Sequence, residues 1–302
     1  MSPRVLPVSA VLLAAVLVSS CSTKRIGISR MADAVSSTAS AYARDDDPEF
    51  VRLAAPSTLK MVEMLLDGQP RHRGLLMTAC SGFAQYAYGF LQVESEKRAR
   101  DNPEESRDLR DRAIHMYDRA RGYCLRGLDA AHPGLSAALA RDPQTALAAA
   151  TQADVPALYW TGIAWGGALS LSDNLLARVG ELVAVRTLLG RALALDETWE
   201  DGAIHETLIV FDGMPVLLGG SASRARAHFD RAVALSNGES AFAYVTLATS
   251  VALRAKDRQE FERLLGAALA IDPSRRPRIR LANLIAQAYA RALLKDADRL
   301  FR

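Results

Sequence analysis

Phe229-Asp230-Arg231-Ala232-Val233-Ala234-Leu235 is the stretch that decides the fold of this 302-residue chain, because it recurs. Segments 189–195 and 265–271 align with it over all seven positions, and 117–120 aligns over the first four. The alanines equivalent to Ala232 are spaced by 72, 40 and 36 residues, which indicates a repeat unit of about 36 residues. A large residue three positions before a small one lets the second helix of a hairpin pack closely on the first. Such a repeat predicts hairpins that bury their apolar faces by stacking.

The rest of the sequence agrees with a helical fold. Alanine and leucine dominate, and no segment alternates with period two. Leu76, Ala79, Phe83, Tyr86 and Phe90 are spaced by three and four residues and predict one apolar helix face. The repeat length is close to the 34 residues of tetratricopeptide hairpins. We therefore predict an all-α fold of stacked tetratricopeptide-like hairpins, an α-solenoid, over residues 30–302.

Prolines, glycines and acidic caps set the expected helix ends. Asp45, Asp46 and Asp47 before Pro48 suit a helix start, and Asp272-Pro273 suits a helix stop. Residues 133–156 are expected to form an insertion without structure or with short helices. The predicted helices are 26–43 and 48–68, 74–95 and 105–130, 157–173 and 179–195, 202–217 and 221–236, 239–254 and 257–271, and a capping helix at 276–296.

The N-terminus has the layout of an export signal. Arg4 precedes an apolar run from Val5 to Val18, and small residues lead into Cys21. Val18-Ser19-Ser20-Cys21 resembles the lipobox of bacterial lipoproteins, which implies cleavage after residue 20 and acylation of Cys21. The expected layout is a signal peptide at 1–20, a lipidated tether at 21–29 and a membrane anchor through acyl chains on Cys21. A cleaved secretory signal with an incidental cysteine is an alternative, whereas the run is too short for a membrane span.

Composition excludes several function classes. Without the signal peptide the net charge is +2, too balanced for a nucleic-acid-binding surface. Beyond Cys21 the chain has Cys80 and Cys124, and no CxxC pair supports a zinc site or a redox motif. We favour two buried free cysteines, with a disulfide as the alternative that an exported protein permits. We expect no metal and no cofactor.

Aromatic residues are the first candidates for a binding groove. Tyr159, Trp160 and Trp165 form a dense group, and Phe83 and Tyr86 lie on the apolar face described above. At helical spacing such residues usually belong to the core. Because tyrosine and tryptophan combine a large contact area with a polar group, these five are also the candidates for contact with an apolar ligand.

His205 and Glu206 are the polar candidates. They begin a zinc-protease motif, but Ile209 stands where the second histidine is required. We expect both side chains to face the concave side or to satisfy helix ends, with binding of a solute or partner as the alternative. Gly219-Gly220-Ser221 lacks the pattern of a nucleophile elbow or phosphate loop and predicts a tight turn with a helix cap. No catalytic cluster is evident, so we do not expect an enzyme.

Several segments, in their order and spacing, resemble the TatT-component family associated with TRAP transporters. They are 46–51, 75–88, 158–165, 202–206, 219–232 and 244–248. The resemblance implies a periplasmic lipoprotein that partners the extracytoplasmic solute-binding subunit of a TRAP transporter. It also implies a homo-oligomer, a trimer, with a pore or groove through each protomer for a small apolar or organic-acid solute.

Two other functions stay open from sequence. A tetratricopeptide lipoprotein also suits an adaptor in outer-membrane or envelope assembly, and a cell-wall hydrolase would require a catalytic cluster that the sequence does not show. Ser22 after Cys21 favours the outer membrane as the anchoring site. The predicted mechanism is geometric, since an anchor at Cys21 raises the local concentration of the helical body near its partners.

Overall fold

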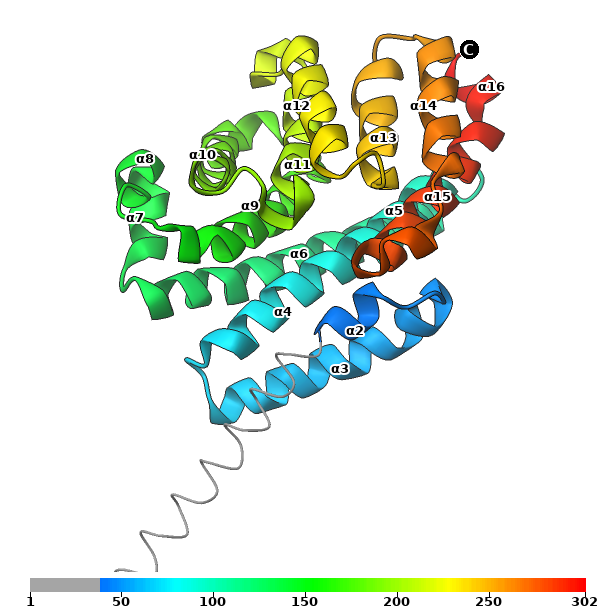
Figure 1. Cartoon of the computed structure of the whole chain (residues 1–302). Helices are drawn as coiled ribbons and strands as arrows, with labels where there is room; N and C mark the ends of the chain where they lie inside the picture. The colour runs from blue at the N-terminus through cyan, green and yellow to red at the C-terminus, as the bar shows by residue number, and fades with distance from the viewer. Residues whose placement is uncertain (1–38) are drawn as a thin grey trace, which may run out of the picture.

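The structure, a computed structural model, describes residues 39–302 (Figure 1). The predicted signal peptide, Cys21, the tether and most of the helix expected at 26–43 lie outside the described residues. Every regular element from residue 39 onward is a helix, which confirms the all-α prediction over this range. No helix in this range is both long enough and apolar enough to cross a membrane.

The helices follow one another through short connections, and two have the predicted bounds, at 48–68 and 179–195. The α-helices are α2 Ala39–Ala43, α3 Pro48–Gly68, α4 Arg73–Tyr86, α5 Val93–Arg98, α6 Pro103–Ala131, α7 Leu135–Arg141, α8 Pro143–Ala146, α9 Val155–Ser170, α10 Val179–Leu195, α11 Ala203–Asp212, α12 Ala222–Leu235, α13 Ala241–Leu247, α14 Arg258–Ala270, α15 Arg280–Lys295 and α16 Ala297–Leu300. Two π-helical segments, η1 Ala87–Gln92 and η6 Ala248–Ala252, extend α4 and α13.

The helices stack in layers, as a solenoid-like fold requires. In sequence order, α3 packs on α4, α4 on α6, α6 on α9 and α9 on α10, and the pairs α11–α12 and α13–α14 continue the array. Figure 1 shows α4 and α6 as the central layer, with α2 and α3 on one side and α9 to α14 on the other. Helix α15 then returns to the start of the array and contacts α2, α3 and α5.

Small residues allow the close helix contacts that the repeat predicts. The alanines at the repeat position have no exposed surface; they are Ala120, Ala192, Ala232 and Ala268. Gly162 of α9 serves the same purpose, because a Cβ atom there would lie 2.8 Å from Cδ2 of Leu189 on α10. The large-then-small pattern therefore marks positions where one helix approaches another.

Cys80 of α4 and Cys124 of α6 form a disulfide, and our preference for two free cysteines is wrong. Both residues are buried, and their Cα atoms lie 4.9 Å apart because the two helices pack side by side. The sequence placed both cysteines at similar depths of successive helices. It did not define the rotation of each helix about its axis, which decides whether the two thiols face each other.

The π-helical segment η1 interrupts the helix predicted at 74–95. The predicted apolar face holds through Phe83, but Tyr86 and Phe90 are half-buried, and Ala87 and Leu91 are buried in their place. A π-helical turn is wider than an α-helical turn, so it rotates the residues that follow it relative to those before it. The predicted face is nevertheless kept in direction, because Phe83, Tyr86 and Phe90 all line cavities beside α3 and the Tyr86 and Phe90 ring centroids lie 5.6 Å apart.

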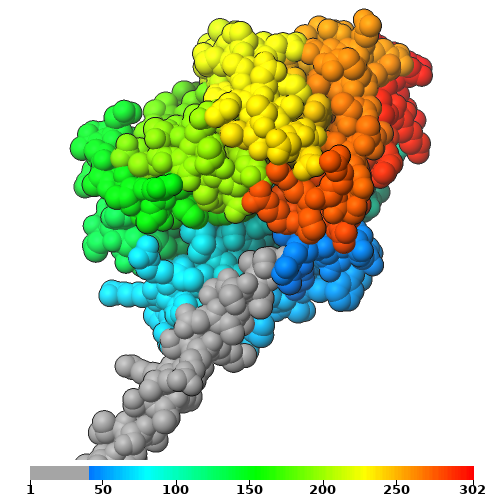
Figure 2. Space-filling model, in the orientation of Figure 1, coloured from blue at the N-terminus to red at the C-terminus, as the bar shows by residue number. Residues whose placement is uncertain are grey.

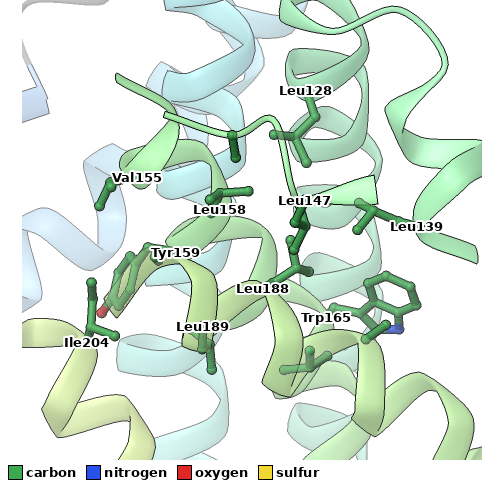
Figure 3. Close-up of a cluster of buried hydrophobic side chains, with 14 of the residues drawn as sticks. Leu128, Leu139, Leu147, Val155, Leu158, Tyr159, Trp165, Leu188, Leu189 and Ile204 are labelled. Carbon is green, nitrogen blue, oxygen red and sulfur yellow. The ribbon is translucent and has the colours of Figure 1, made fainter. Parts of the chain in front are cut away.

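Residues 133–156 contain the short helices α7 and α8 and a 3-10 helix, Gln152–Asp154. This segment packs as part of the core: Leu139 and Leu147 join Leu158 of α9 and Leu188 of α10 in one buried cluster (Figure 3). The insertion therefore covers the end of the α9–α10 hairpin.

Candidate functional site

The predicted aromatic residues Tyr159 and Trp160 lie on α9, where Tyr159 faces the segment that leads into α11. The Tyr159 ring stands edge-on to Trp160, with 5.0 Å between centroids, and its centroid lies 4.5 Å from that of Trp199. Thr207 of α11 donates a 3.4 Å hydrogen bond to the Tyr159 hydroxyl, and burial raises the pKa of this phenol. Tyr159 is buried, as Figure 3 shows, whereas Trp160 keeps part of its surface accessible.

Glu206 of α11 lies close enough to act on this aromatic group. Its charge contributes to the raised pKa of Tyr159. Burial raises the pKa of Glu206 itself to about 7, against the opposing effects of a hydrogen bond from Ser240 and the positive charge of Arg276. The side chain is nevertheless partly accessible. A carboxyl group whose pKa lies near 7 is present in both its protonated and its ionised form at neutral pH. It can therefore either donate or accept a hydrogen bond.

Glu96 of α5 is a second carboxyl group in similar surroundings. It is exposed to solvent, yet enough protein surrounds it that burial raises its pKa. Oε2 of Glu96 accepts a 2.5 Å hydrogen bond from Tyr289, and Oε1 accepts one of 2.9 Å from Gln92. No ion pair to Glu96 occurs within residues 39–302.

Tyr88 of η1 connects the two carboxyl groups. Burial raises its pKa, and the negative charges of both Glu96 and Glu206 raise it further. Its ring lies edge-on to Phe242 of α13, with 5.4 Å between centroids. We call the group of side chains formed by Tyr88, Glu96, Tyr159, Trp160 and Glu206 the inner surface. It combines aromatic rings with two carboxyl groups that form no ion pair within 4.0 Å in the described part of the chain.

Phe83 and Tyr86 lie elsewhere, in a cavity of about 300 Å³ between α3, α4 and α6. Arg119 lies over the Phe83 ring, 5.0 Å from its centroid, and donates two hydrogen bonds of 2.5 Å to Glu63. Burial alone would raise the pKa of Glu63, but hydrogen bonds from Tyr123, Arg119 and Lys60 lower it overall. The cavity is lined by Pro56, Leu59, Lys60, Glu63, Phe83, Tyr86, Met116 and Arg119.

Trp165 and His205 belong to neither place. Trp165 is buried in the core, where it donates a 2.7 Å hydrogen bond to Glu181 beneath the guanidinium of Arg121. Nδ1 of His205 lies 2.7 Å from Nδ1 of His228 of α12, and its Nε2 lies 3.2 Å from Glu197. His205 is thus part of the seam between α11 and α12.

The predicted candidates therefore fall into separate places, and of the seven only Tyr159, Trp160 and Glu206 share the inner surface. Sequence reasoning missed Tyr88 and Glu96. Tyr88 lies on the π-helical segment η1, and Glu96 lies on α5, the helix that follows it. Gly219 and Ser221 form the predicted tight turn and cap, with Gly219 at φ 79° and Ser221 accepting from the Arg224 N–H. No group of three or more His, Cys, Asp or Glu side chains in residues 39–302 could hold a metal ion.

These features define an all-α, solenoid-like protein whose helical stack brings aromatic and carboxyl side chains together. The TRAP transporter T-component family matches the sequence over residues 44–301, and the chain belongs to this family. It is 28% identical over 265 residues to an uncharacterized protein of Treponema pallidum (strain Nichols), which covers 86% of this chain and 82% of that protein. The protein is accordingly an accessory component of a TRAP transport system.

Proposed function

We propose that this protein is a periplasmic accessory component, anchored by acyl chains on Cys21, that binds the extracytoplasmic solute-binding subunit of a TRAP transporter. Family membership over residues 44–301 supports the transport role. A homo-oligomer, a trimer by resemblance, and an outer-membrane location complete the proposal. The observation that carries it is the inner surface, where Tyr88, Glu96, Trp160 and Glu206 keep accessible surface, because a protein that relays a solute requires accessible aromatic and polar side chains.

The inner surface limits which solute suits it. Glu96 and Glu206 would repel a carboxylate, whereas their raised pKa values allow them to share protons with a neutral molecule. The aromatic rings of Tyr88, Tyr159 and Trp160 supply apolar contact area. Among small apolar and organic-acid solutes, an apolar one, or an organic acid in its protonated form, therefore suits the inner surface better than a carboxylate.

A rigid apolar patch is the surface we assign to the solute-binding subunit. Val216 and Leu217 are 84% and 82% exposed at the tip of the loop between α11 and α12, and Val183 of α10 is exposed one turn before Arg186, which contacts this loop. Arg186 donates to the carbonyl oxygens of Phe211 and Leu218 and so fixes the loop. A preorganised apolar tip loses little entropy when a protein partner covers it.

Affinity capture of the full-length protein from membranes of its own bacterium, after mild crosslinking, tests this proposal. We expect mass spectrometry to identify a TRAP solute-binding subunit. The double variant Val216→Asp/Leu217→Asp should lose this partner, and Phe50→Ser/Leu53→Ser, a second exposed apolar pair, on α3, should retain it. Recovery of envelope-assembly factors in place of the solute-binding subunit, or equal capture by both variants, would contradict the proposal.

A further inference from the structure

Helix α3 carries an apolar stripe that no described part of the chain covers. Four large side chains on its outer face are exposed: Phe50 60%, Leu53 63%, Met61 37% and Met64 68%. Their spacing of three, eight and three residues places them within one narrow arc of the helix, while Val62 and Leu66 face the core. We call these four residues the α3 stripe. Over about 14 residues it extends about 21 Å along the helix.

Charge is sparse along the α3 stripe. Ser57 is the polar residue within the arc, and Lys60 borders it, paired with Glu63 at 3.1 Å. A lysine at the edge of an apolar face can extend its ammonium group toward water or phosphate while its methylene groups stay in apolar contact. Beyond the end of α3, Arg71 and Arg73 are exposed and make no ion pair within residues 39–302.

The chain reaches this layer directly from the predicted lipid attachment. Cys21 precedes Ala39 by 18 residues, so a fully extended chain limits their separation to about 65 Å. The first described helix, α2, is joined to α3 by a 2.5 Å hydrogen bond between Tyr42 and Thr58. Figures 1 and 2 show α2 and α3 together at one edge of the molecule, with α12 and α14 on the opposite side. The anchored chain therefore enters the fold on the layer that carries the α3 stripe.

We propose that the α3 stripe rests in the interface of the lipid bilayer to which Cys21 anchors the protein, an inference that depends on the acylation in the proposed function. The partner is a lipid surface: apolar side chains of a surface-lying helix enter the boundary between headgroups and acyl chains, and flanking arginines meet lipid phosphates. This contact fixes the orientation of the protein. The tip formed by Val216 and Leu217 then faces away from the membrane, toward the periplasmic partner.

Site-specific fluorescence on the full-length, acylated protein tests this orientation. Because Cys80 and Cys124 are paired, a cysteine introduced at Met61 supplies the thiol for an environment-sensitive dye. Val183→Cys is the matched control, since Val183 is a 54% exposed apolar residue on α10, away from α3. Both proteins are reconstituted in vesicles of phosphatidylethanolamine and phosphatidylglycerol, with or without nitroxide-labelled lipid.

We expect the nitroxide lipid to quench the dye at residue 61 and to leave the dye at residue 183 unquenched. Replacing Phe50, Leu53 and Met64 by serine should abolish quenching at residue 61 while the protein still floats with the vesicles. Equal quenching at both positions, or none at residue 61 in floating protein, would overturn the orientation. Blue-shifted but unquenched emission that depends on protein density would assign the stripe to a second copy instead. Failure to float would overturn the acyl anchor and this inference together, whereas loss of the solute-binding subunit alone would leave the inference intact.

Discussion

The hydroxyl of Tyr289 lies 2.5 Å from Oε2 of Glu96, a residue 193 positions earlier in the chain. This contact joins α15 to α5 and so connects the last long helix to the first half of the array. Gln92 bonds both Glu96 and the hydroxyl of Tyr117, so a hydrogen-bonded series runs from the central helix α6 to α15. The C-terminal part of the helical stack is thereby held to its central layer as well as to its neighbours in sequence.

Tyr289→Phe should remove this connection. We expect a loss of about 1–2 kcal/mol in the free energy of unfolding, because the buried hydroxyl makes a hydrogen bond to a carboxyl group. The bond from Tyr289 lowers the pKa of Glu96, so this pKa should rise in the variant. Urea unfolding and NMR titration of the carboxyl carbon measure the two effects. Tyr244→Phe is the control, and an equal loss in both variants would show that the hydroxyl bond to Glu96 is not the cause.

Reduction of the disulfide should destabilise the protein through the unfolded state. Cys80 and Cys124 are 44 residues apart, and a closed loop of this length restricts the unfolded chain by about 4 kcal/mol in the entropic account. Urea unfolding of Cys80→Ala/Cys124→Ala, compared with the oxidised protein, should show a loss of about 2–4 kcal/mol. A double variant as stable as the oxidised protein would contradict the stabilising role of this bond.

Gly162→Ala should be costly although alanine is the better helix former. The added methyl group would meet the Leu189 side chain at 2.8 Å, and forcing an atom into a packed helix contact costs about 1–3 kcal/mol. Gly190→Ala on α10 is the matched control, because no atom lies within 4 Å of the position that its added methyl group would take. The control should be neutral or more stable by up to about 1 kcal/mol. Thermal or urea unfolding separates the two, and equal behaviour would argue against close contact between α9 and α10.

Glu206 should make stability fall as pH rises. Its pKa is raised by burial from 4.5 to about 7, so the folded protein holds this proton more tightly than the unfolded chain. The stabilisation is complete below pH 4.5 and is lost as pH rises to about 7. Relative to the wild type, Glu206→Gln should therefore gain stability to unfolding of about 3 kcal/mol across this window. Asp142→Asn is the control, because hydrogen bonds from Thr145 lower the pKa of Asp142, so its titration lies below the window. Urea unfolding at several pH values provides the measurement, and parallel curves for wild type and Glu206→Gln would contradict the assignment.

The sequence predicted the positions of the helices better than the contacts between their side chains. Helix α3 begins where expected because Asp47 caps it through the N–H groups of Glu49 and Phe50, an interaction local to the sequence. The side-chain partners of Glu96 were not predictable in the same way, because the π-helical segment η1 changes the direction in which the side chains of the following helix α5 point relative to those of α4. Pairing of Cys80 with Cys124 likewise depends on how two helices turn toward each other. Local patterns determine helix ends, whereas tertiary packing determines which side chains meet.

The return of α15 to the beginning of the array also affects the order in which the chain can fold. Helices α4 and α6 pack on neighbours close in sequence, so they can associate early in folding. Helices α2, α3 and α5, in contrast, also wait for contacts from α15, which is among the last segments to be synthesised. A chain that emerges N-terminus first therefore completes its early layers only once α15 has formed. Truncation before residue 280 would leave the N-terminal layers open, and a protease would have a long interval in which to recognise them.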